Sequence, residues 1–170
     1  LAVDVNASVL DSTLEPAAGT DPALRLGLDR VRGLSRDGAE CLVAARADGA
    51  FRDVGELARR ARLPRRDLEA LAAAGALAGL AGHRHLAAWQ VLGIGPPLPL
   101  LPDAEHNEGI PLLRTPSEGE DIVADYRAVG LTLGRHPLAL LRSQLDACGW
   151  MPAVDVLRLA DGARVTTGGI

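Results

Sequence analysis

The chain has 170 residues, a formal net charge of −4 and a hydrophobic fraction of 48%. This length suits one or two small domains, and the acidic balance does not by itself suggest a nucleic-acid partner. The sequence contains no apolar run of the roughly 18 residues that a membrane span needs, so we expect no membrane partner.

The composition predicts a mainly helical protein. Aromatic residues make up only 2% of the chain, so the core has to be built from Ala, Leu and other small or branched side chains, which suits closely packed helices. Cys41 and Cys148 are far apart and match no metal-binding or redox spacing, which is typical of free thiols in a cytoplasmic protein.

The charges are distributed unevenly along the chain. Residues 1–24 hold four acids and no arginine, residues 25–84 hold 12 arginines against 8 acids, and residues 85–170 hold 6 arginines against 10 acids. The positive charge is therefore concentrated over residues 25–84, within a chain that is acidic as a whole.

Residues 1–22 are predicted to form an extended N-terminal segment. Apolar and polar residues alternate over LAVDVNASVLDSTLE, with Asn6 and Ser8 near a turn. The chain opens without the charged n-region of a signal peptide, and we expect it to be a segment of a longer protein.

Residues 23–92 are predicted to form two helix-hairpin-helix elements, the first around the turn RGLSRDGAE (Arg32–Glu40). The apolar residues of LRLGLDRV and AECLVAAR predict a helix on each side, and Ser35 is a good N-cap for the second helix. The free amides at such a helix N-terminus form an anion site, to which Arg32 and Arg36 add charge. Because Ser35 replaces the second glycine of the usual hairpin, an ordinary αα-turn explains this stretch about equally well.

The second hairpin follows a capped helix. Asp53–Arg62 is predicted to be a helix with Asp53 as its N-cap, Glu56 in a capping box, and Gly49 as the C-cap of the helix before it. Leu63–Leu80 then repeats the first hairpin, with a turn at Pro64, and the repetition favours contact with a nucleic-acid backbone. The predicted phosphate-binding residues of the two hairpins are Arg32, Gly33, Leu34, Ser35, Arg36, Gly38, Arg65 and Arg66.

The remainder of the chain is predicted to be a linker, a helical connector and a strand. Residues 93–116 are rich in proline, and their PLPLLP core is either packed down or a docking peptide. Residues 117–162 form the connector, whose first helix has a Ser117–Glu120 capping box and places Ile122, Val123, Tyr126 and Val129 inward. Residues 163–170 (ARVTTGGI) read as a strand.

Several of these segments resemble a known family. They are VDVNAS, ALRLGLDRVRGL, LEALAAAGAL followed by GHR, and above all EDIVADYRAVGLTLGRHPLALLR. Together they resemble the alpha subunit of bacterial C-family DNA polymerases, in particular the error-prone, translesion branch of the ImuC type. The resemblance implies that the chain runs from the end of the fingers region, through a tandem helix-hairpin-helix domain and a connector, to the first strand of an OB fold.

The resemblance also implies a division of labour within the parent polymerase. Nucleotidyl transfer needs clustered carboxylates that hold Mg²⁺, and the family keeps them in the palm, upstream of this region. The acids here are scattered, and the cluster Glu118, Glu120, Asp121 and Asp125 reads as a cap and a solvated helix face. His83 and His85 do not share a helix face. We therefore expect no catalytic residue, metal site or cofactor in this chain.

The sequence thus predicts a non-catalytic module that grips the primer–template duplex through backbone phosphates. The alternative is a protein-interaction module that docks a mutasome or replisome partner, such as an accessory protein related to Y-family polymerases. The replicative relatives carry a short clamp-binding peptide after the hairpins, with a leading Gln and a terminal aromatic residue. Pro97 and Leu101 stand at those places here, so no direct binding to the sliding clamp is expected.

Overall fold

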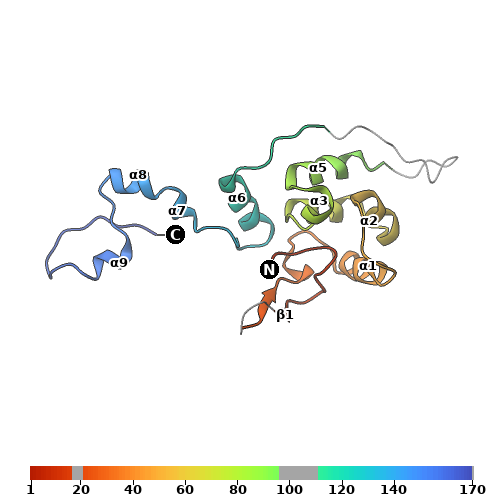
Figure 1. Ribbon diagram of the computed structural model, residues 1–170, viewed down its shortest axis with the longest axis horizontal. Helices are drawn as coiled ribbons and strands as arrows, with labels where there is room; N and C mark the ends of the chain where they lie inside the picture. The colour runs from red at the N-terminus through yellow and green to blue at the C-terminus, as the bar shows by residue number, and fades with distance from the viewer. Residues whose placement is uncertain (17–20, 96–110, 170) are drawn as a thin grey trace. The chain divides into compact units, whose positions relative to one another are not determined.

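The computed structural model describes residues 1–16, 21–95 and 111–169, and it is mainly helical with two short strands (Figure 1). The chain divides into two compact units, Leu1–Leu133 and Gly134–Ile170. Among the described residues, no helix combines the length and the apolarity needed to cross a bilayer.

The first unit opens with an antiparallel hairpin. Strand β1 (Thr13–Glu15) pairs with β2 (Ala23–Arg25), and a 3-10 helix, η1 (Leu28–Arg30), follows. The α-helix predicted before the first turn is therefore wrong. Leu24, Leu26 and Leu28 alternate with the period of a strand, and Gly27 lies so close to the backbone of residues 10–12 that a Cβ there would overlap it.

Five helices form the body of this unit. They are α1 (Arg36–Arg46), α2 (Val54–Ala61), α3 (Arg65–Ala73), α4 (Ala78–Ala81) and α5 (Arg84–Gly93). The predicted N-caps Ser35 and Asp53 are confirmed, since their side chains accept hydrogen bonds from the amides of Gly38 and Glu56.

Two predicted helix ends differ in detail. Glu56 accepts a hydrogen bond from the amide of Arg52 at 2.9 Å, one residue before the N-cap, so its carboxylate does not close the expected capping box with Asp53. Helix α1 ends at Arg46 with Ala47 as its C-cap, and Gly49 follows with φ +117°. Gly49 therefore lies in the connection after the helix.

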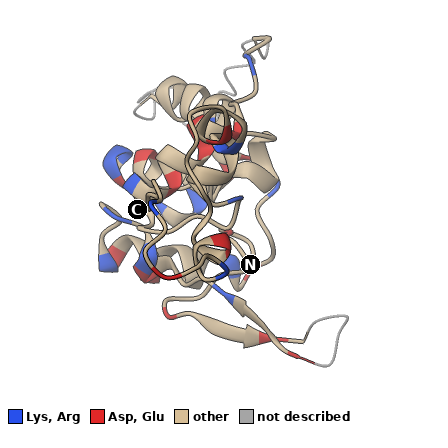
Figure 2. Ribbon diagram, turned by 90° about the vertical axis from the view of Figure 1, so that its left-hand side faces the viewer, with Lys and Arg blue, Asp and Glu red and all other residues tan. Residues whose placement is uncertain are grey.

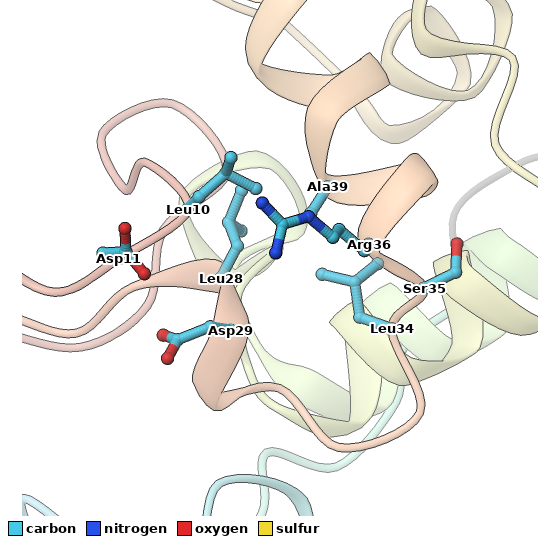
Figure 3. A pocket seen from close by; sticks show the side chains of 8 residues that line it. All are labelled: Leu10, Asp11, Leu28, Asp29, Leu34, Ser35, Arg36 and Ala39. Atoms are coloured by element: carbon cyan, nitrogen blue, oxygen red, sulfur yellow. The ribbon is translucent and has the colours of Figure 1, made fainter.

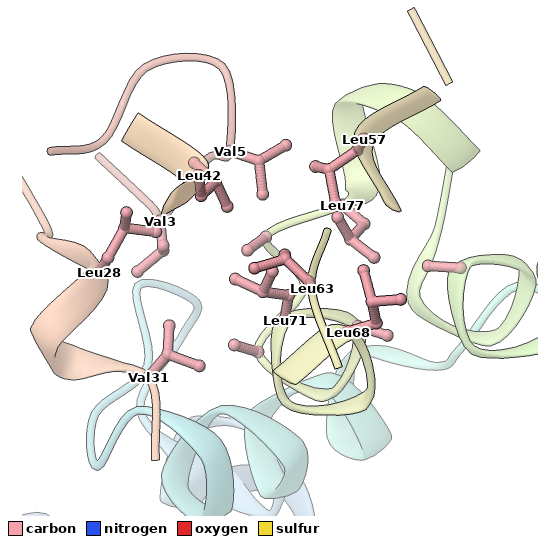
Figure 4. Close-up of a cluster of buried hydrophobic side chains, with 14 of the residues drawn as sticks. Val3, Val5, Leu28, Val31, Leu42, Leu57, Leu63, Leu68, Leu71 and Leu77 are labelled. Atoms are coloured by element: carbon pink, nitrogen blue, oxygen red, sulfur yellow. The ribbon is translucent and has the colours of Figure 1, made fainter. Parts of the chain in front are cut away.

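The core of the first unit is built mainly from aliphatic side chains of the helices and of the N-terminal segment. Leu42, Leu57, Leu68, Leu71 and Leu77 are fully buried, and Figure 4 shows the leucines meeting side chains from the N-terminal segment and the 3-10 helix. Full burial of each such side chain contributes about 1.5–3 kcal/mol. The side chains that they meet from the N-terminal part of the chain are Val3, Val5, Leu28 and Val31.

Helix α6 (Glu118–Ala128) completes the first unit by packing against α3, so the compact unit reaches Leu133, beyond residue 92. The Ser117–Glu120 capping box is confirmed. Of the side chains predicted to face inward, Ile122 is buried and Val129 packs against the core, whereas Val123 and Tyr126 are about half exposed. Asp121 and Asp125 of α6 form ion pairs with Arg84 and lie on the same side of the helix as Ile122.

The second unit contains three short helices, α7 (Pro137–Leu140), α8 (Arg142–Ala147) and α9 (Ala153–Val156). Residues 163–169, predicted as a strand, form no strand, and their backbone hydrogen bonds to the preceding segment are those from the amide of Met151 to the carbonyl of Thr166 and from the amide of Ala163 to the carbonyl of Ala160. A strand needs a neighbouring strand for its ladder of hydrogen bonds, and no strand within the described part of this unit offers one.

Candidate nucleic-acid interface

The two predicted hairpins meet at one buried carboxylate. Asp67, in the first turn of α3, is fully buried and accepts hydrogen bonds from the amide of Ser35 at 3.2 Å and from its hydroxyl at 2.5 Å. Ser35 is in turn the N-cap of α1. Ser35 and Asp67 are 32 residues apart in the sequence. Their contact therefore places the N-termini of α1 and α3 side by side.

Gly38 allows this close approach. A Cβ at Gly38 would overlap the Asp67 carboxylate and would also lie 2.9 Å from the Ser35 hydroxyl. The role of Gly38 at the predicted site is therefore to make room for Asp67, and the Ser35 hydroxyl is engaged within the protein.

Some backbone amides at both helix N-termini remain available. The amides of Arg36 and Asp37 in α1, and those of Arg65 and Arg66 in α3, make no hydrogen bond to any described residue. Helix α3 also lacks a side-chain cap, because Pro64 stands at its N-cap. Such amides, together with the positive end of the helix dipole, favour an anion.

Three of the predicted arginines lie exposed beside these amides. Arg36 pairs with Glu40 at 3.0 Å, Arg65 pairs with Glu69 at 2.9 Å, and Arg66 lies 3.3 Å from Asp67. These side chains are between 54% and 84% exposed, and ion pairs at such exposure are worth at most about 1 kcal/mol. The guanidiniums of Arg36 and Arg65 could therefore turn to an anion at little cost, whereas Arg66 contacts the fully buried carboxylate of Asp67.

Arg32, by contrast, is used inside the first unit. Its guanidinium donates to the carbonyls of Tyr126 and Arg127 at 3.1 and 3.2 Å, and its amide donates to Ala128 at 2.8 Å. These carbonyls are at the C-terminal end of α6, where a cation is favoured. Gly33, with φ +89°, supplies the left-handed turn that follows.

A shallow cavity of about 260 Å³ lies beside the first hairpin. Figure 3 shows the Arg36 side chain reaching from α1 toward Leu10 and Leu28, with Leu34 beside its stem and with Asp11 and Asp29 on the side away from α1. The cavity thus combines an apolar lining with two carboxylates and one guanidinium. It suits an apolar side chain better than a phosphate, because the carboxylates repel an anion.

Two further arginines, Arg59 and Arg62, did not enter the predicted site. Both are exposed and neither has a hydrogen-bond or ion-pair partner among the described residues. The signal in the sequence is the run RRARLPRR at residues 59–66, which holds five arginines and no acid. Elsewhere, basic and acidic positions are interspersed over the helices (Figure 2).

Glu56, a carboxylate on the same helix as Arg59, is already engaged by two arginines. Hydrogen bonds from the Arg52 side chain and amide, and then from Arg60, lower the pKa of Glu56 to about 2. Its negative charge is therefore matched by Arg52 and Arg60, and it does not neutralise Arg59 or Arg62.

Residues for other chemistries are not brought together. Within residues 1–16, 21–95 and 111–169, no three His, Cys, Asp or Glu side chains form a group that could hold a metal ion. His83 caps α5, and His85 bonds to the carbonyl of Arg114. The Glu120 carboxylate meets Arg114 and the Ser117 amide, which lower its pKa, as expected of a helix cap.

Comparisons with known proteins agree with this geometry. Residues 1–87 match the helix-hairpin-helix motif family. The chain is 54% identical over 168 residues to an error-prone DNA polymerase of Alkalilimnicola ehrlichii, and 44% identical over 186 residues to one of Methylococcus capsulatus. Each match covers 99% of this chain but only 16% and 18% of the relative. The chain belongs to the helix-hairpin-helix family, and it corresponds to a short segment of error-prone DNA polymerases.

Proposed function

We propose that this chain grips duplex DNA through its backbone phosphates, as a non-catalytic segment of a cytoplasmic error-prone DNA polymerase acting in damage-induced, translesion synthesis. The observation that carries the proposal is the convergence of the N-termini of α1 and α3 through Ser35 and Asp67. This contact brings the unpaired amides of both helix N-termini near one another, and the exposed arginines of residues 36, 65 and 66 flank them.

The contacts would be of the kind that holds DNA without reading its sequence. The amides of residues 36, 37, 65 and 66 would donate to phosphate oxygens, and Arg36, Arg65 and Arg66 would add charge-assisted hydrogen bonds. Phosphate contacts fix position and carry no base information, which suits a polymerase that must move along any template. Arg32 contributes by holding α6 in place beside the first turn.

Nucleotidyl transfer itself would be performed elsewhere in the parent protein. The relatives are about six times longer than the segment matched here, since the match covers 16% of the first of them. We propose that their remaining length includes the palm carboxylates and the Mg²⁺ ions that transfer requires. The present chain would then contribute binding free energy and no reacting group.

A salt titration of DNA binding tests the proposal. The full chain should bind unrelated duplexes with equal affinity at about 50 mM salt, and the logarithm of affinity should fall steeply with that of salt concentration. Arg36→Glu should lower this slope by about one while leaving the fold intact. If the chain shows no affinity at about 50 mM salt, where non-specific binders are usually micromolar or better, the proposal is wrong.

The cavity beside the first hairpin favours a second function, that of a protein-interaction module. Its apolar lining and its two carboxylates, Asp11 and Asp29, suit an apolar side chain next to a basic one. The proposed partner is an accessory mutasome protein related to Y-family polymerases. Leu34→Asp in the lining would weaken binding to such a partner. A steep salt dependence of DNA affinity is expected only if the chain binds DNA phosphates, as in the first proposal.

A further inference from the structure

Ten of the twelve arginines between residues 25 and 84 have a hydrogen-bond or ion-pair partner in the structure. The two that have none among the described residues are Arg59 and Arg62, which are exposed and three positions apart. The ten with partners are Arg25, Arg30, Arg32, Arg36, Arg46, Arg52, Arg60, Arg65, Arg66 and Arg84.

The two unpartnered arginines occupy the outer face of α2. Val54, Leu57 and Ala61 form the buried face of this helix. On the opposite face, a Cβ at Gly55 would lie 3.2 Å from Oδ1 of the N-cap Asp53 and 3.4 Å from Nη1 of Arg59, so the Arg59 guanidinium lies along the helix toward its N-terminal end. Arg62 stands at the C-cap, at the other end. The outer face therefore has a cation toward each end.

Arg62 occupies a backbone conformation that glycine adopts more easily. Its φ is +49° and its ψ is +40°, in the left-handed region, and it is the one non-glycine residue with positive φ among the described residues. Glycine is the usual residue at such a position after a helix. An exposed arginine there combines an unfavourable backbone with a charge that no described residue pairs, and this combination motivates a search for an external ligand.

The neighbourhood strengthens the positive charge. Residues 59–66 hold five arginines and no acid, and Glu56 is matched by Arg52 and Arg60. An eight-residue helix is about 12 Å long, which is long enough to lie against more than one phosphate of a B-DNA strand, whose charges rise by about 3.4 Å each along the duplex axis. A duplex strand laid along α2 could therefore meet both guanidiniums and continue to the turn before α3.

We propose that Arg59 and Arg62 bind phosphates of one strand of duplex DNA and extend the hairpin surface along the outer face of α2. This inference rests on the proposed function, because it adds two phosphate contacts to the same DNA-binding surface. Neither guanidinium has to leave an ion pair before it binds, so each contributes its full counterion release. Guanidinium groups also match phosphate geometry with two parallel hydrogen bonds.

The test compares variants of the full chain with equal loss of charge. R59Q/R62Q should weaken binding to a duplex by about tenfold for each lost contact at roughly 0.1 M salt, and should lower the salt slope by about two. The control R158Q/R164Q removes two exposed arginines of the second unit and should change the slope little. Circular dichroism should show wild-type helix content for both variants.

A further variant guards against loss of folding. Arg62→Gly removes the charge and suits the left-handed backbone, so it should retain or raise the melting temperature while lowering the salt slope by about one. If the wild-type chain binds DNA and R59Q/R62Q keeps the wild-type slope, or loses no more than R158Q/R164Q, this inference is wrong and the proposed function stands. A wild-type chain that does not bind DNA would overturn both.

Discussion

Asp67 shows how one residue can join two hairpins. Its carboxylate is fully buried and accepts hydrogen bonds from both the amide and the hydroxyl of Ser35. Gly38 has no Cβ, which would otherwise overlap this carboxylate. A buried carboxylate is costly unless it is hydrogen-bonded. This cost makes the Ser35–Asp67 contact a strong determinant of how α1 and α3 are placed.

Asp67→Ala is expected to destabilise the first unit. The substitution leaves the amide and hydroxyl of the half-buried Ser35 without their acceptor, and a fully buried unsatisfied group would cost about 1–3 kcal/mol. Urea unfolding followed by circular dichroism measures the loss. Glu69→Ala on the same helix removes an exposed carboxylate and should stay within about 0.5 kcal/mol of wild type. Equal stability of the two variants would contradict this role for Asp67.

Glu56 gives a residue-scale prediction on pH. Arg52 and Arg60 lower the pKa of Glu56 from 4.5 to about 2 in the folded chain. Between these two values the unfolded chain binds more protons, so this stabilisation is fully present above pH 4.5 and is lost as the pH falls toward 2. The melting temperature of Glu56→Gln should therefore fall less steeply than that of wild type over this interval. Parallel curves would show that the carboxylate does not contribute.

At the scale of elements, α6 behaves as part of the hairpin unit. Arg84 at the start of α5 donates to the Asp121 carbonyl at 3.1 Å and to the Asp125 carboxylate at 2.5 Å, and its side chain is only 14% exposed. Arg32 holds the other end of α6. Polar contacts at both ends thus supplement the burial of Ile122.

Asp125→Ala is expected to loosen α6 without unfolding the other helices. Arg84 would lose its closest carboxylate partner in a largely buried setting, at a cost of roughly 1–3 kcal/mol. Hydrogen exchange should become faster for the α6 amides and remain slow for those of α1 and α3. Arg127→Ala, which removes an exposed side chain of the same helix, serves as the control. A uniform increase in exchange over the whole unit would contradict a local role.

At the scale of the whole molecule, recruitment to the replication machinery can be predicted from one short segment. Pro97–Leu101 lies outside the described residues, and its expected deviation from a clamp-binding peptide stays a prediction. Proline in place of Gln would leave polar groups of the clamp pocket unpaired, at roughly 1–3 kcal/mol. Leucine in place of an aromatic residue would lose about 1 kcal/mol more.

Together these losses would weaken a micromolar peptide by about two to three powers of ten. Calorimetric titration of the chain with the sliding clamp of the same organism should therefore detect no complex, and recruitment would depend on a partner protein. A micromolar or tighter complex that is lost in the variant L100A/L101A would contradict the prediction.

Local signals in the sequence were enough to place most of the helices. Ser35, Asp53 and Ser117 were identifiable as N-caps because a cap and the amide that it receives lie within three residues of each other. The apolar residues of α2 and α3 likewise recur at helical spacing, and Val54, Leu57, Leu68 and Leu71 are buried. The helix predicted before the first turn is absent because this segment pairs as strand β2 and packs at Gly27 against the backbone of residues 10–12, a contact that the local pattern does not encode.

Contacts between residues distant in the sequence depended on the tertiary structure. Asp67 and Ser35 are 32 residues apart, Arg84 and Asp125 are 41 apart, and Arg32 lies 94 residues before Tyr126. The sequence alone determined the family, the helical class and the basic region, because these follow from composition, period and motif. Only the folded chain decided which arginines remain unpaired, because ion pairing depends on distances in space that no local pattern encodes.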